Sequence, residues 1–591
     1  MQVCEKLEEL RAAMVAENVD ALIIGNSDPH NNEYVAPRWR CREWVSHMKG
    51  SSGVVVLTAD WCGLWADSRY YEAAEAALEG TEIELVRMSD VGVDPLEKWL
   101  AKNLSEGQTV AFNGEDISLE LARKYLKQCK RAGLKTKTDL DFVDPLWADR
   151  PAAPKGEFYI VSDEMVGQSI ADKIADVQKE MADQKLDAFL FGRTDESCWL
   201  LNFRGNDVPG NPTPYCYTLV TRDEAFFFVD SDKLTAEAVE KFTSAGVTLK
   251  EYEALEAHLK GLSKEASILT IPRYLNYRLA TAVEHCEVVE SRSIATDLKG
   301  VKNATEIANF KAVLIDDGVA MVKFFVELYG RLKRGEKVTE LSASNLLEEC
   351  RASMPGFRHP SFTSIMGYGP DGALNHYSVD ETTDKEVKLE NIFLIDSGGN
   401  YAHGTTDTTR TIPMGEPTEL QKEDYTCVLS SFITLMTTKF SEGTTGAQLD
   451  GICRVPLWER QRNFKHGTGH GIGFGLEVHE GPQNISGLSL EKFVLGQVTT
   501  IEPGCYRPGQ HGIRIENMVH TVLSAENEFG RFFEFENLTL CPINTDLIKK
   551  EFLSESQIAW LNSYHEEVVE KLSPMLNDEQ KAWLVHECRA I

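Results

Sequence analysis

The sequence lacks the features that mark nucleic-acid-binding, membrane and secreted proteins. Its 61 lysines and arginines stand against 92 aspartates and glutamates, a formal net charge of −31. This balance argues against nucleic acids and anionic membranes, which both need a basic surface, and we expect neither as a partner. No apolar run approaches the ~18 residues that span a bilayer. Acidic residues occupy the N-terminal segment where a signal peptide would be apolar, so we expect a protein that stays in the cytoplasm.

Several motifs of common enzyme classes are also missing. The thirteen cysteines are scattered and include no CxxC pair, which argues against a disulfide framework or zinc knuckle and favours reduced thiols. The chain has neither the HExxH sequence of single-zinc proteases nor the Gly-x-Ser-x-Gly elbow of serine hydrolases. The segment GYGPDG at 367–372 matches GxGxxG, but no βαβ pattern surrounds it, and we interpret the match as coincidental.

What the sequence does contain begins with an internal repeat. The segment KLEELRAAMVAENVDALIIGNSD, from Lys6, aligns with KIADVQKEMADQKLDAFLFGRTD, from Lys173. Each has the apolar spacing of an amphipathic helix that leads into a short buried strand. Helices that alternate with strands in this way are typical of α/β domains. The two copies differ at one position of interest, because the second has Asp232 where the first has Arg69.

Two candidate boundaries divide the chain, which at 591 residues is too long for one hydrophobic core. The segment 147–157 is rich in proline and alanine and is expected to be extended and exposed. A helix-start pattern at Asn303 opens a long amphipathic stretch. We also expect a helical tail from residue 554, with Trp560 and Trp583 on its packing faces. The predicted domains are an α/β domain at 1–152, its repeat at 153–300, and a third domain at 301–591.

Five residues of metal-binding type lie in the last third of the chain. Asp396 and Asp407 flank one glycine-rich segment between strand-like sequences, and Glu502 and Glu516 flank another. His470 lies among alternating glycines in KHGTGHGIGF, which lacks the Lys-Ser/Thr ending of a phosphate-binding loop. We expect two hairpins that each present two acids, and therefore a pseudo-symmetric domain.

Four carboxylates and one imidazole at one place would repel each other unless cations lay between them. This oxygen-rich set with a single nitrogen suits two hard or borderline divalent ions. Two such ions about 3.5–4 Å apart hold a bridging hydroxide and act as Lewis acids in hydrolysis. The sequence therefore predicts a dinuclear metallohydrolase.

Three histidines lie close to these segments, namely His376, His466 and His479. A lone histidine is usually structural, but imidazoles beside a metal site can hold a scissile carbonyl, position an amine or carry a proton near neutral pH. The residue pattern does not assign these roles individually. Glu480, next to His479, is a further candidate for proton handling.

Together the motifs resemble those of the pita-bread metallopeptidases. The resemblance is carried by IDSGGNY, GTTDTTRT, HGTGHGIG, VHEGP, TIEPGCY and GIRIEN in the third domain. It extends over the whole chain through NFRGNDVPGNP at 202–212 and LWADSRYY at 64–71, and the length is similar to that of the three-domain aminopeptidase P family. It implies an α/β (α+β) fold with two related N-terminal creatinase-like domains and a C-terminal pita-bread catalytic domain.

The resemblance also implies roles for individual residues. Asp407 and Glu516 would bridge two ions, usually manganese in this family although cobalt or zinc would also fit, with Asp396 on one ion and His470 with Glu502 on the other. The three histidines would act in catalysis, and His376 and His479 would also contact the substrate. The remaining substrate-binding residues implied are Tyr506 and Arg514 near the proline pocket and Arg69, which would reach the site of the other subunit in a homodimer.

The implied reaction removes the first residue from a peptide whose second residue is proline. Several alternatives remain open at this point. A prolidase, which cleaves X-Pro dipeptides, has the same ligands but normally one N-terminal domain. A methionine aminopeptidase is much shorter, and creatinase-like enzymes lack the ligand set. Binding modules without catalysis use the same scaffold but typically lose the ligands.

Overall fold

The computed structural model describes residues 2–374, 377 and 379–591. The chain forms two compact units. The first comprises residues 1–160, 169–209 and 213–295, and the second comprises 161–168, 210–212 and 296–591. None of the helices in the described part of the chain is long and apolar enough to cross a membrane. All of the cysteines are free thiols.

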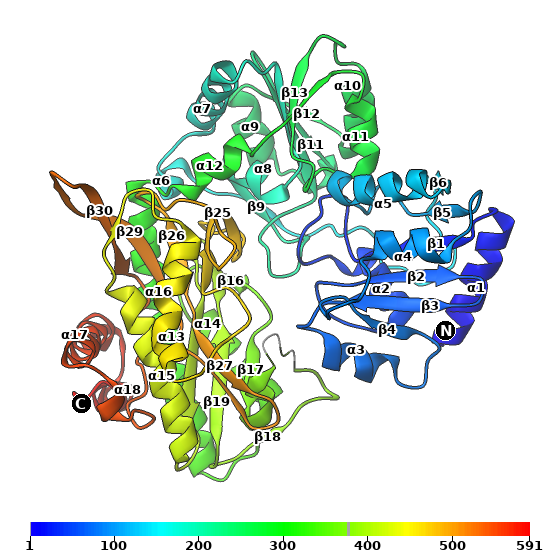
Figure 1. The fold of residues 1–591 in the computed structure, drawn as a ribbon. Coiled ribbons are helices and arrows are strands. Elements are labelled where there is room, and N and C mark those ends of the chain that lie inside the picture. Colours follow the sequence, from blue (N-terminus) through cyan, green and yellow to red (C-terminus); the bar gives the residue numbers. More distant parts are fainter. Residues whose placement is uncertain (1, 375–376, 378) are drawn as a thin grey trace. The chain divides into compact units, whose positions relative to one another are not determined.

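The first sheet of the N-terminal unit has helices on both faces (Figure 1). Its six strands lie in the order β4-β3-β2-β1-β5-β6, and β1 pairs antiparallel with β2 and parallel with β5. The elements are α1 Val3–Ala16, β1 Ala21–Ile24, α2 Cys41–Ser46, β2 Val54–Thr58, β3 Cys62–Ala66, α3 Tyr71–Leu78, β4 Glu84–Arg87, α4 Leu96–Asn103, β5 Thr109–Ala111, α5 Leu119–Arg131 and β6 Lys135–Lys137.

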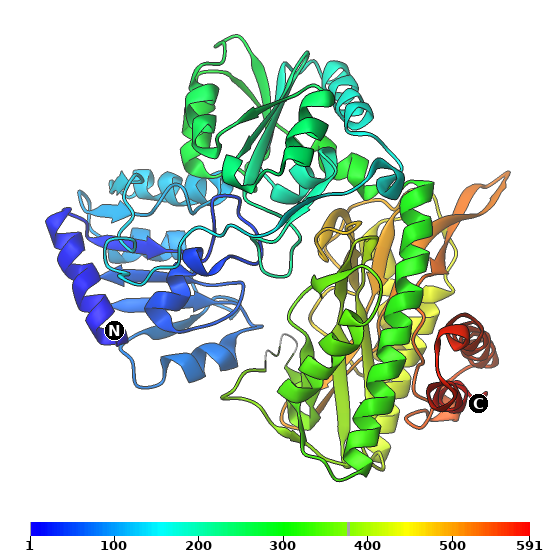
Figure 2. The same ribbon diagram turned by 180° about the vertical axis from the view of Figure 1, so that it is seen from behind.

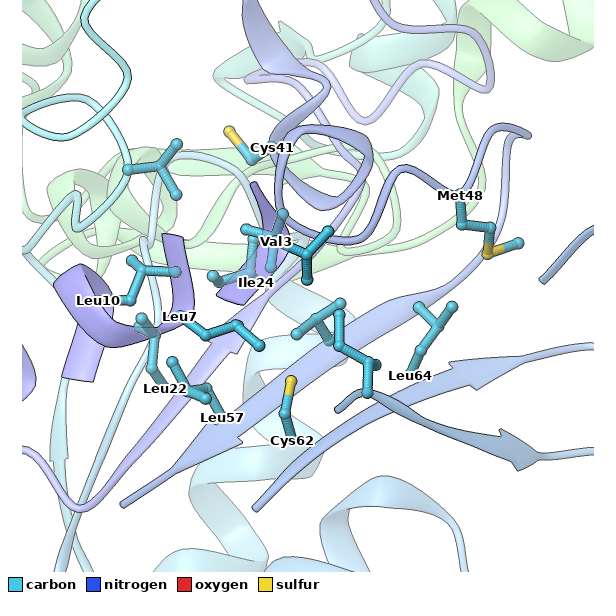
Figure 3. Close-up of a cluster of buried hydrophobic side chains, with 14 of the residues drawn as sticks. Val3, Leu7, Leu10, Leu22, Ile24, Cys41, Met48, Leu57, Cys62 and Leu64 are labelled. Carbon is cyan, nitrogen blue, oxygen red and sulfur yellow. The ribbon is translucent and has the colours of Figure 1, made fainter. Parts of the chain in front are cut away.

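The periodicity of α1 explains how it packs on this sheet. Val3, Leu7 and Leu10 recur at the spacing of one helix face, and all three are buried. Figure 3 shows them in one cluster with Leu22 and Ile24 of β1, which share a face because alternate residues of a strand point the same way.

A second sheet in the same unit repeats this architecture. Its strand order, β12-β11-β10-β8-β13-β14, corresponds strand for strand to the first. The elements are α7 Ile170–Asp183, β8 Ala188–Phe191, α8 Thr194–Leu200, β10 Cys216–Thr221, β11 Ala225–Val229, α9 Ala236–Ser244, β12 Val247–Lys250, α10 Leu255–Lys260, β13 Ser267–Thr270, α11 Tyr277–Val283 and β14 Glu287–Glu290. Even the register agrees, since Ala21 lies opposite Thr58 and Ala188 opposite Thr221. The predicted pair of related α/β domains is confirmed.

A buried lysine occupies the same place in both copies. The Nζ atom of Lys6 donates to the carbonyl of Trp44 at 2.6 Å, and that of Lys173 to the carbonyl of Trp199 at 2.9 Å. Each ammonium also lies over the ring of its own tryptophan partner, at 5.1 Å from the ring centre of Trp44 and 5.0 Å from that of Trp199. The hydrogen bond and the cation–π contact offset part of the free-energy cost of burying each ammonium group.

The C-terminal unit is built on the long helix α13, Ala304–Lys333. The helix begins where the sequence predicts, because the side chain of Asn303 accepts the amide protons of Thr305 and Glu306. Helix α14 Glu340–Ala352 packs against it, and α15 Glu419–Met436 packs against α16 Gly446–Glu459. The unit also contains a three-stranded sheet of β17 Ile365–Tyr368, β19 Ile392–Ser397 and β22 Thr408–Pro413.

A six-stranded sheet completes this unit, in the order β23-β30-β29-β26-β24-β25. Its strands are β23 Phe440–Ser441, β24 Gly469–Gly471, β25 Glu480–Ile485, β26 Val498–Ile501, β29 Asn517–Asn527 and β30 Gly530–Asn537.

The C-terminal tail is helical, as predicted. Helices α17 Glu555–Leu572 and α18 Asp578–Glu587 pack beside α13, and Figure 2 shows them from the side on which α13 lies in front. The ring of Trp560 lies 5.9 Å from that of Phe432 in the C-terminal unit, and Trp583 stacks on Phe325 of α13 with ring centres 5.6 Å apart. Both tryptophans therefore lie on packing faces of the tail.

Candidate metal centre

Two pairs of antiparallel strands carry the four predicted acidic ligands. Asp396 lies in β19 opposite Thr409 of β22, and Asp407 is the residue just before β22. In the other sheet, Glu502 directly follows β26 and Glu516 directly precedes β29, and these strands pair with each other. Each pair therefore presents two acids at the same end, as the sequence predicts.

The connections within these pairs are more ordered than the sequence suggests. Where glycine-rich loops were expected, the first connection contains the strands β20 Gly399–Tyr401 and β21 Gly404–Thr405. The second folds into a hairpin of β27 Gly504–Arg507 and β28 His511–Arg514. The reason is that each connection finds backbone hydrogen bonds of its own, which the glycine content alone does not reveal.

Hydrogen bonds join the two strand pairs directly. The amide of Glu516 donates to the carbonyl of Thr409 at 3.1 Å, and the Thr409 hydroxyl donates to Oε2 of Glu516 at 2.7 Å. The adjacent Arg410 is buried and donates to the carbonyl of Glu516 at 2.7 Å. These contacts fix the position of one acid relative to the other three.

Three of the predicted ligands already have the spacing of a metal site. Three ligand atoms, one each from Asp407, His470 and Glu516, lie within 4.8 Å of one another. The Nε2 atom of His470 is 3.4 Å from Asp407 and 3.7 Å from Glu502. Its Nδ1 atom lies 3.1 Å from the carbonyl of Gly471 and donates to it, which turns Nε2 toward the acids.

The electrostatics of the acids also fit cations. Burial, followed by the charges of the neighbouring carboxylates, raises the pKa of Glu516 well above its ordinary value. Burial likewise raises the pKa of Glu502 to about 7, although His470 opposes the shift. Among the described residues, Oδ1 of Asp396 and Oδ1 of Asp407 are buried without a hydrogen-bond partner. Unpaired buried oxygens that repel each other are suited to divalent cations, and the residues present fit such ions.

A second group of side chains lies beside the acids. The guanidinium of Arg514 forms an ion pair with Asp396 and donates to the hydroxyl of Tyr506 at 2.6 Å. That hydroxyl is 2.8 Å from Nε2 of His466, whose Nδ1 lies 2.7 Å from the carbonyl of Gly467. Because Arg514 can only donate and Nδ1 faces an acceptor, the Tyr506 proton points to Nε2 of His466.

The structure brings a second predicted histidine to the same place. The ring of His479 lies 4.4 Å from that of His470, nearly perpendicular to it. His376 lies outside the described residues. Glu480 contacts the ammonium groups of Lys299 and Lys302, both at 2.6 Å and all three buried. These two ion pairs balance the charge of the Glu480 carboxylate, and its role in proton handling stays a prediction.

Arg69 belongs to the N-terminal unit. Its Nε and Nη2 atoms donate to the two oxygens of Asp67 at 3.0 and 2.9 Å, and its guanidinium lies over the ring of Tyr70. The side chain is more than one-third exposed. At the matching place in the second copy, Asp232 pairs with Lys155 at 2.8 Å. The two copies therefore present charges of opposite sign here.

Residues that support the site were missed by the sequence analysis. Thr409 and Arg410 link the strand pairs, and Asp424 of α15 anchors the β27–β28 hairpin. An arginine within the strand-like run TTDTTRT is the one signal that points to Arg410, because a charged residue in a buried strand needs buried partners. Asp424 gives no such signal.

Buried carboxylates with one imidazole on paired strands define the class of divalent-metal hydrolases, and comparison with known proteins identifies the family. Residues 311–522 match metallopeptidase family M24, and residues 531–591 match the C-terminal region of peptidase M24. Residues 6–141 and 149–306 each match a creatinase/prolidase N-terminal domain.

Relatives match the chain over almost its entire length. A probable Xaa-Pro aminopeptidase P of Laccaria bicolor is 35% identical, with 99% of this chain and 93% of the relative covered. Aminopeptidase P2 of Arabidopsis thaliana is 33% identical, with 100% and 89% covered. The crystal structure of an X-prolyl aminopeptidase from Caenorhabditis elegans, described as a cytosolic enzyme with a di-nuclear active site, superposes with a TM-score of 0.95 at 30% identity, with 100% of both chains covered. The chain belongs to metallopeptidase family M24 and has its pita-bread domain preceded by two creatinase-type domains.

Proposed function

We propose that this protein is a metal-dependent Xaa-Pro aminopeptidase, which releases the N-terminal residue from peptides with proline in second position. The observation that carries the proposal is the convergence of Asp407, His470 and Glu516 within 4.8 Å, with Asp396 and Glu502 beside them. Relatives that match 99% of this chain and are named probable Xaa-Pro aminopeptidase P support the substrate class.

The five ligands would hold two divalent ions, with manganese as our first choice and cobalt or zinc as alternatives. Asp407 and Glu516 would contact both ions, Asp396 one of them, and His470 with Glu502 the other. When bound, such ions supply Lewis acidity and lower the pKa of water. The free amine of the substrate would meet the metal site and its acidic ligands, which would restrict cleavage to the N-terminus.

The neighbouring polar groups would orient the peptide. An Xaa-Pro bond has no N–H, and the proline ring fixes its φ angle, so recognition must rely on the carbonyl and the ring. We propose that His376 and His479 hydrogen-bond the scissile carbonyl and the negative charge that develops there. Tyr506 and Arg514 would form the side of the pocket that faces the ring, and His466, held by Tyr506, would transfer a proton.

Hydrolysis of an Arg-Pro-Pro tripeptide beside an Ala-Pro dipeptide tests this function. The protein would be stripped of metal and reloaded with manganese, cobalt or zinc in separate samples, with Asp407→Ala as the inactive control. Metal-dependent release of the first residue from the tripeptide is expected. Turnover of the dipeptide alone would identify a prolidase, and no turnover with any metal would favour a binding module without catalysis.

We also propose three domains, at residues 1–152, 153–300 and 301–591. Each six-stranded sheet of the N-terminal unit falls within one of the first two segments, since β6 ends at Lys137 and β14 at Glu290, which supports this division.

A cytoplasmic location is consistent with the free thiols and with the description of the Caenorhabditis elegans enzyme as cytosolic.

A homodimer, in which Arg69 reaches the site of the other subunit, is the remaining part of the proposal. Arg69→Ala should lower kcat/KM by about 10-fold, the value of one hydrogen bond to a charged group. Arg87→Ala, at an exposed arginine of the same domain, is the matched control. Mixing Arg69→Ala chains with Asp407→Ala chains should restore activity, because the mixed dimer pairs an intact site with an intact Arg69. Failure of this complementation would argue against the dimer role.

A further inference from the structure

Asp424 is a buried carboxylate outside the ligand set that joins three segments of the C-terminal unit. It lies in α15 and is fully buried. It accepts hydrogen bonds from Nη2 of Arg507 at 3.0 Å, Nε2 of His511 at 3.0 Å and Nε of Arg462 at 2.6 Å. Burial alone would raise its pKa, but the hydrogen bonds from His511, Arg507 and Arg462 outweigh burial and hold the pKa well below its usual range. Asp424 is therefore an ionised anchor.

Two of these partners belong to the hairpin β27–β28, and they are cross-strand neighbours. Arg507 lies directly opposite His511, and Tyr506 lies opposite Gly512. Residues that are opposite each other in a pair share a face, and the face alternates along each strand. The face of the hairpin that carries Arg507 and His511 is thus fixed to α15 by one carboxylate.

The other face of the same hairpin carries the groups placed beside the acids. Gly504 lies opposite Arg514, so Arg514 and Tyr506 share this face. Gly512 shares this face directly opposite Tyr506, and a Cβ atom there would be 1.6 Å from the carbonyl oxygen of Gly372. The hairpin is thus held between Asp424 on one face and the backbone of Gly372 on the other, which leaves it little freedom to shift.

The third partner extends the anchor to the histidine. Arg462 lies in the segment that follows α16 and precedes His466. The same carboxylate therefore holds both the hairpin with Tyr506 and the segment that leads to His466. The hydrogen bond between Tyr506 and Nε2 of His466, at 2.8 Å, joins these two anchored segments.

We propose that Asp424 is a positioning residue for the reaction, which keeps Tyr506 and Arg514 aligned with His466 and Asp396. Its hydrogen-bond partners among the described residues are Arg462, Arg507 and His511, none of which is a predicted metal ligand, and it acts through the hairpin. This proposal rests on the proposed function, because the hairpin matters for catalysis only if Tyr506 and Arg514 face a substrate. Misplacement of such groups by about 1 Å can cost two orders of magnitude in rate.

The first test is a double-mutant cycle between Asp424→Asn and Tyr506→Phe. The asparagine keeps the size of the side chain but removes its charge. In the metal-loaded enzyme, Asp424→Asn should lower kcat for an Xaa-Pro tripeptide by about 10-fold or more, per folded molecule, with a smaller change in KM. In the Tyr506→Phe background the same change should cost less than about 3-fold, because the hydroxyl it positions is gone. Equal losses in both backgrounds would overturn the proposal.

The matched control is Asp28→Asn in the N-terminal unit. Asp28 is also fully buried and accepts hydrogen bonds from the Tyr215 hydroxyl at 2.8 Å and the His30 amide at 3.0 Å. Its loss should lower the Tm while kcat per folded molecule stays the same. If Asp28→Asn and Asp424→Asn lower kcat equally, Asp424 has only a general structural role and the proposal fails.

Hydrogen–deuterium exchange measured by mass spectrometry gives a readout that does not depend on activity. Asp424→Asn should increase the exchange rate of residues 504–514 by about 10-fold or more, since amide protection reports local opening. Residues 304–333 of α13 serve as the internal reference and should be unchanged. If wild-type protein cleaved no Xaa-Pro peptide, the proposed function would fail, but this exchange would still test the anchor. An unchanged exchange rate in the hairpin would overturn the proposal that Asp424 anchors it.

Discussion

The two sides of the candidate site have opposite electrostatic character. On one side, Asp396, Asp407, Glu502 and Glu516 are gathered so closely that burial and mutual repulsion raise the pKa values of three of them. On the other side, Arg514, Tyr506 and His466 form a chain of hydrogen bonds in which each polar group has a partner. The acidic side needs added positive charge to balance its carboxylates. The polar side finds its hydrogen-bond partners within the protein.

This difference separates two kinds of contribution to function. The acidic side should determine whether metal binds, and its cost in the metal-free protein should be visible as lower stability. The polar side should determine how the substrate is held once metal is present. Arg514 connects the two because it contacts both Asp396 and Tyr506.

The largest expected effect is the loss of the metal site in Asp407→Ala. Activity on an Xaa-Pro tripeptide should fall by at least about 10⁴-fold, because metal ions contribute several kcal/mol to hydrolysis and each 1.4 kcal/mol is tenfold in rate. Elemental analysis should find less than the wild-type metal content. The control is Glu442→Ala, which removes an exposed acid that pairs with Arg531 at 2.9 Å. Full metal content with full activity in Asp407→Ala would contradict the assignment of the acidic side as the metal-binding side.

The next effect should come from the residue that joins the sides. Arg514→Gln leaves Asp396 buried without its cation, and the metal-free protein should lose about 3–5 kcal/mol in free energy of unfolding, as when one partner of a buried ion pair is removed. Denaturant titration measures this loss. Arg531→Gln, at an exposed pair, should change stability by less than about 0.5 kcal/mol. Equal free energies of unfolding for Arg514→Gln and Arg531→Gln would show that the ion pair between Arg514 and Asp396 does not stabilise the metal-free protein.

A pH dependence follows from the raised pKa of Glu502. Its folded value of about 7 lies above the ordinary value of 4.5. The folded state therefore binds the proton more tightly, and the resulting stability is present below pH 4.5 and is lost as the pH rises through 7. In metal-free protein the loss should be about 3 kcal/mol, at about 1.4 kcal/mol per pKa unit. Urea titrations at pH 5 and pH 8 should show a smaller loss for Glu502→Gln. An equal loss of stability between pH 5 and pH 8 in the wild type and in Glu502→Gln would show that groups other than Glu502 determine the pH dependence.

The acidic side was predictable from the sequence, and the reason is local. Each ligand lies in a short segment where glycines and strand-like residues set it apart, and the two strand pairs place the acids by simple register. The internal repeat and the start of α13 at Asn303 were predictable in the same way, because amphipathic spacing and capping are properties of neighbouring residues.

The supporting contacts of the polar side were not predictable, because they join distant segments. Asp424 lies in a helical stretch with other acids and looks like an ordinary solvated residue, yet its partners Arg462 and Arg507 are 38 and 83 residues away. Arg410 contacts groups more than 100 residues away. No local pattern carries such pairings, which depend on how the sheets and α15 pack together.

The smallest effect should come from Tyr506→Phe, and it tests whether the polar side acts mainly through orientation. The change removes only the hydroxyl between Arg514 and His466 and leaves the ring in place. We expect kcat/KM to fall by about 10-fold, as for one hydrogen bond to a charged group, with stability reduced by about 1 kcal/mol. Metal content should remain that of the wild type, in contrast to Asp407→Ala. A loss of metal in Tyr506→Phe would show that the two sides are not separable and that the polar side also maintains the ligand set.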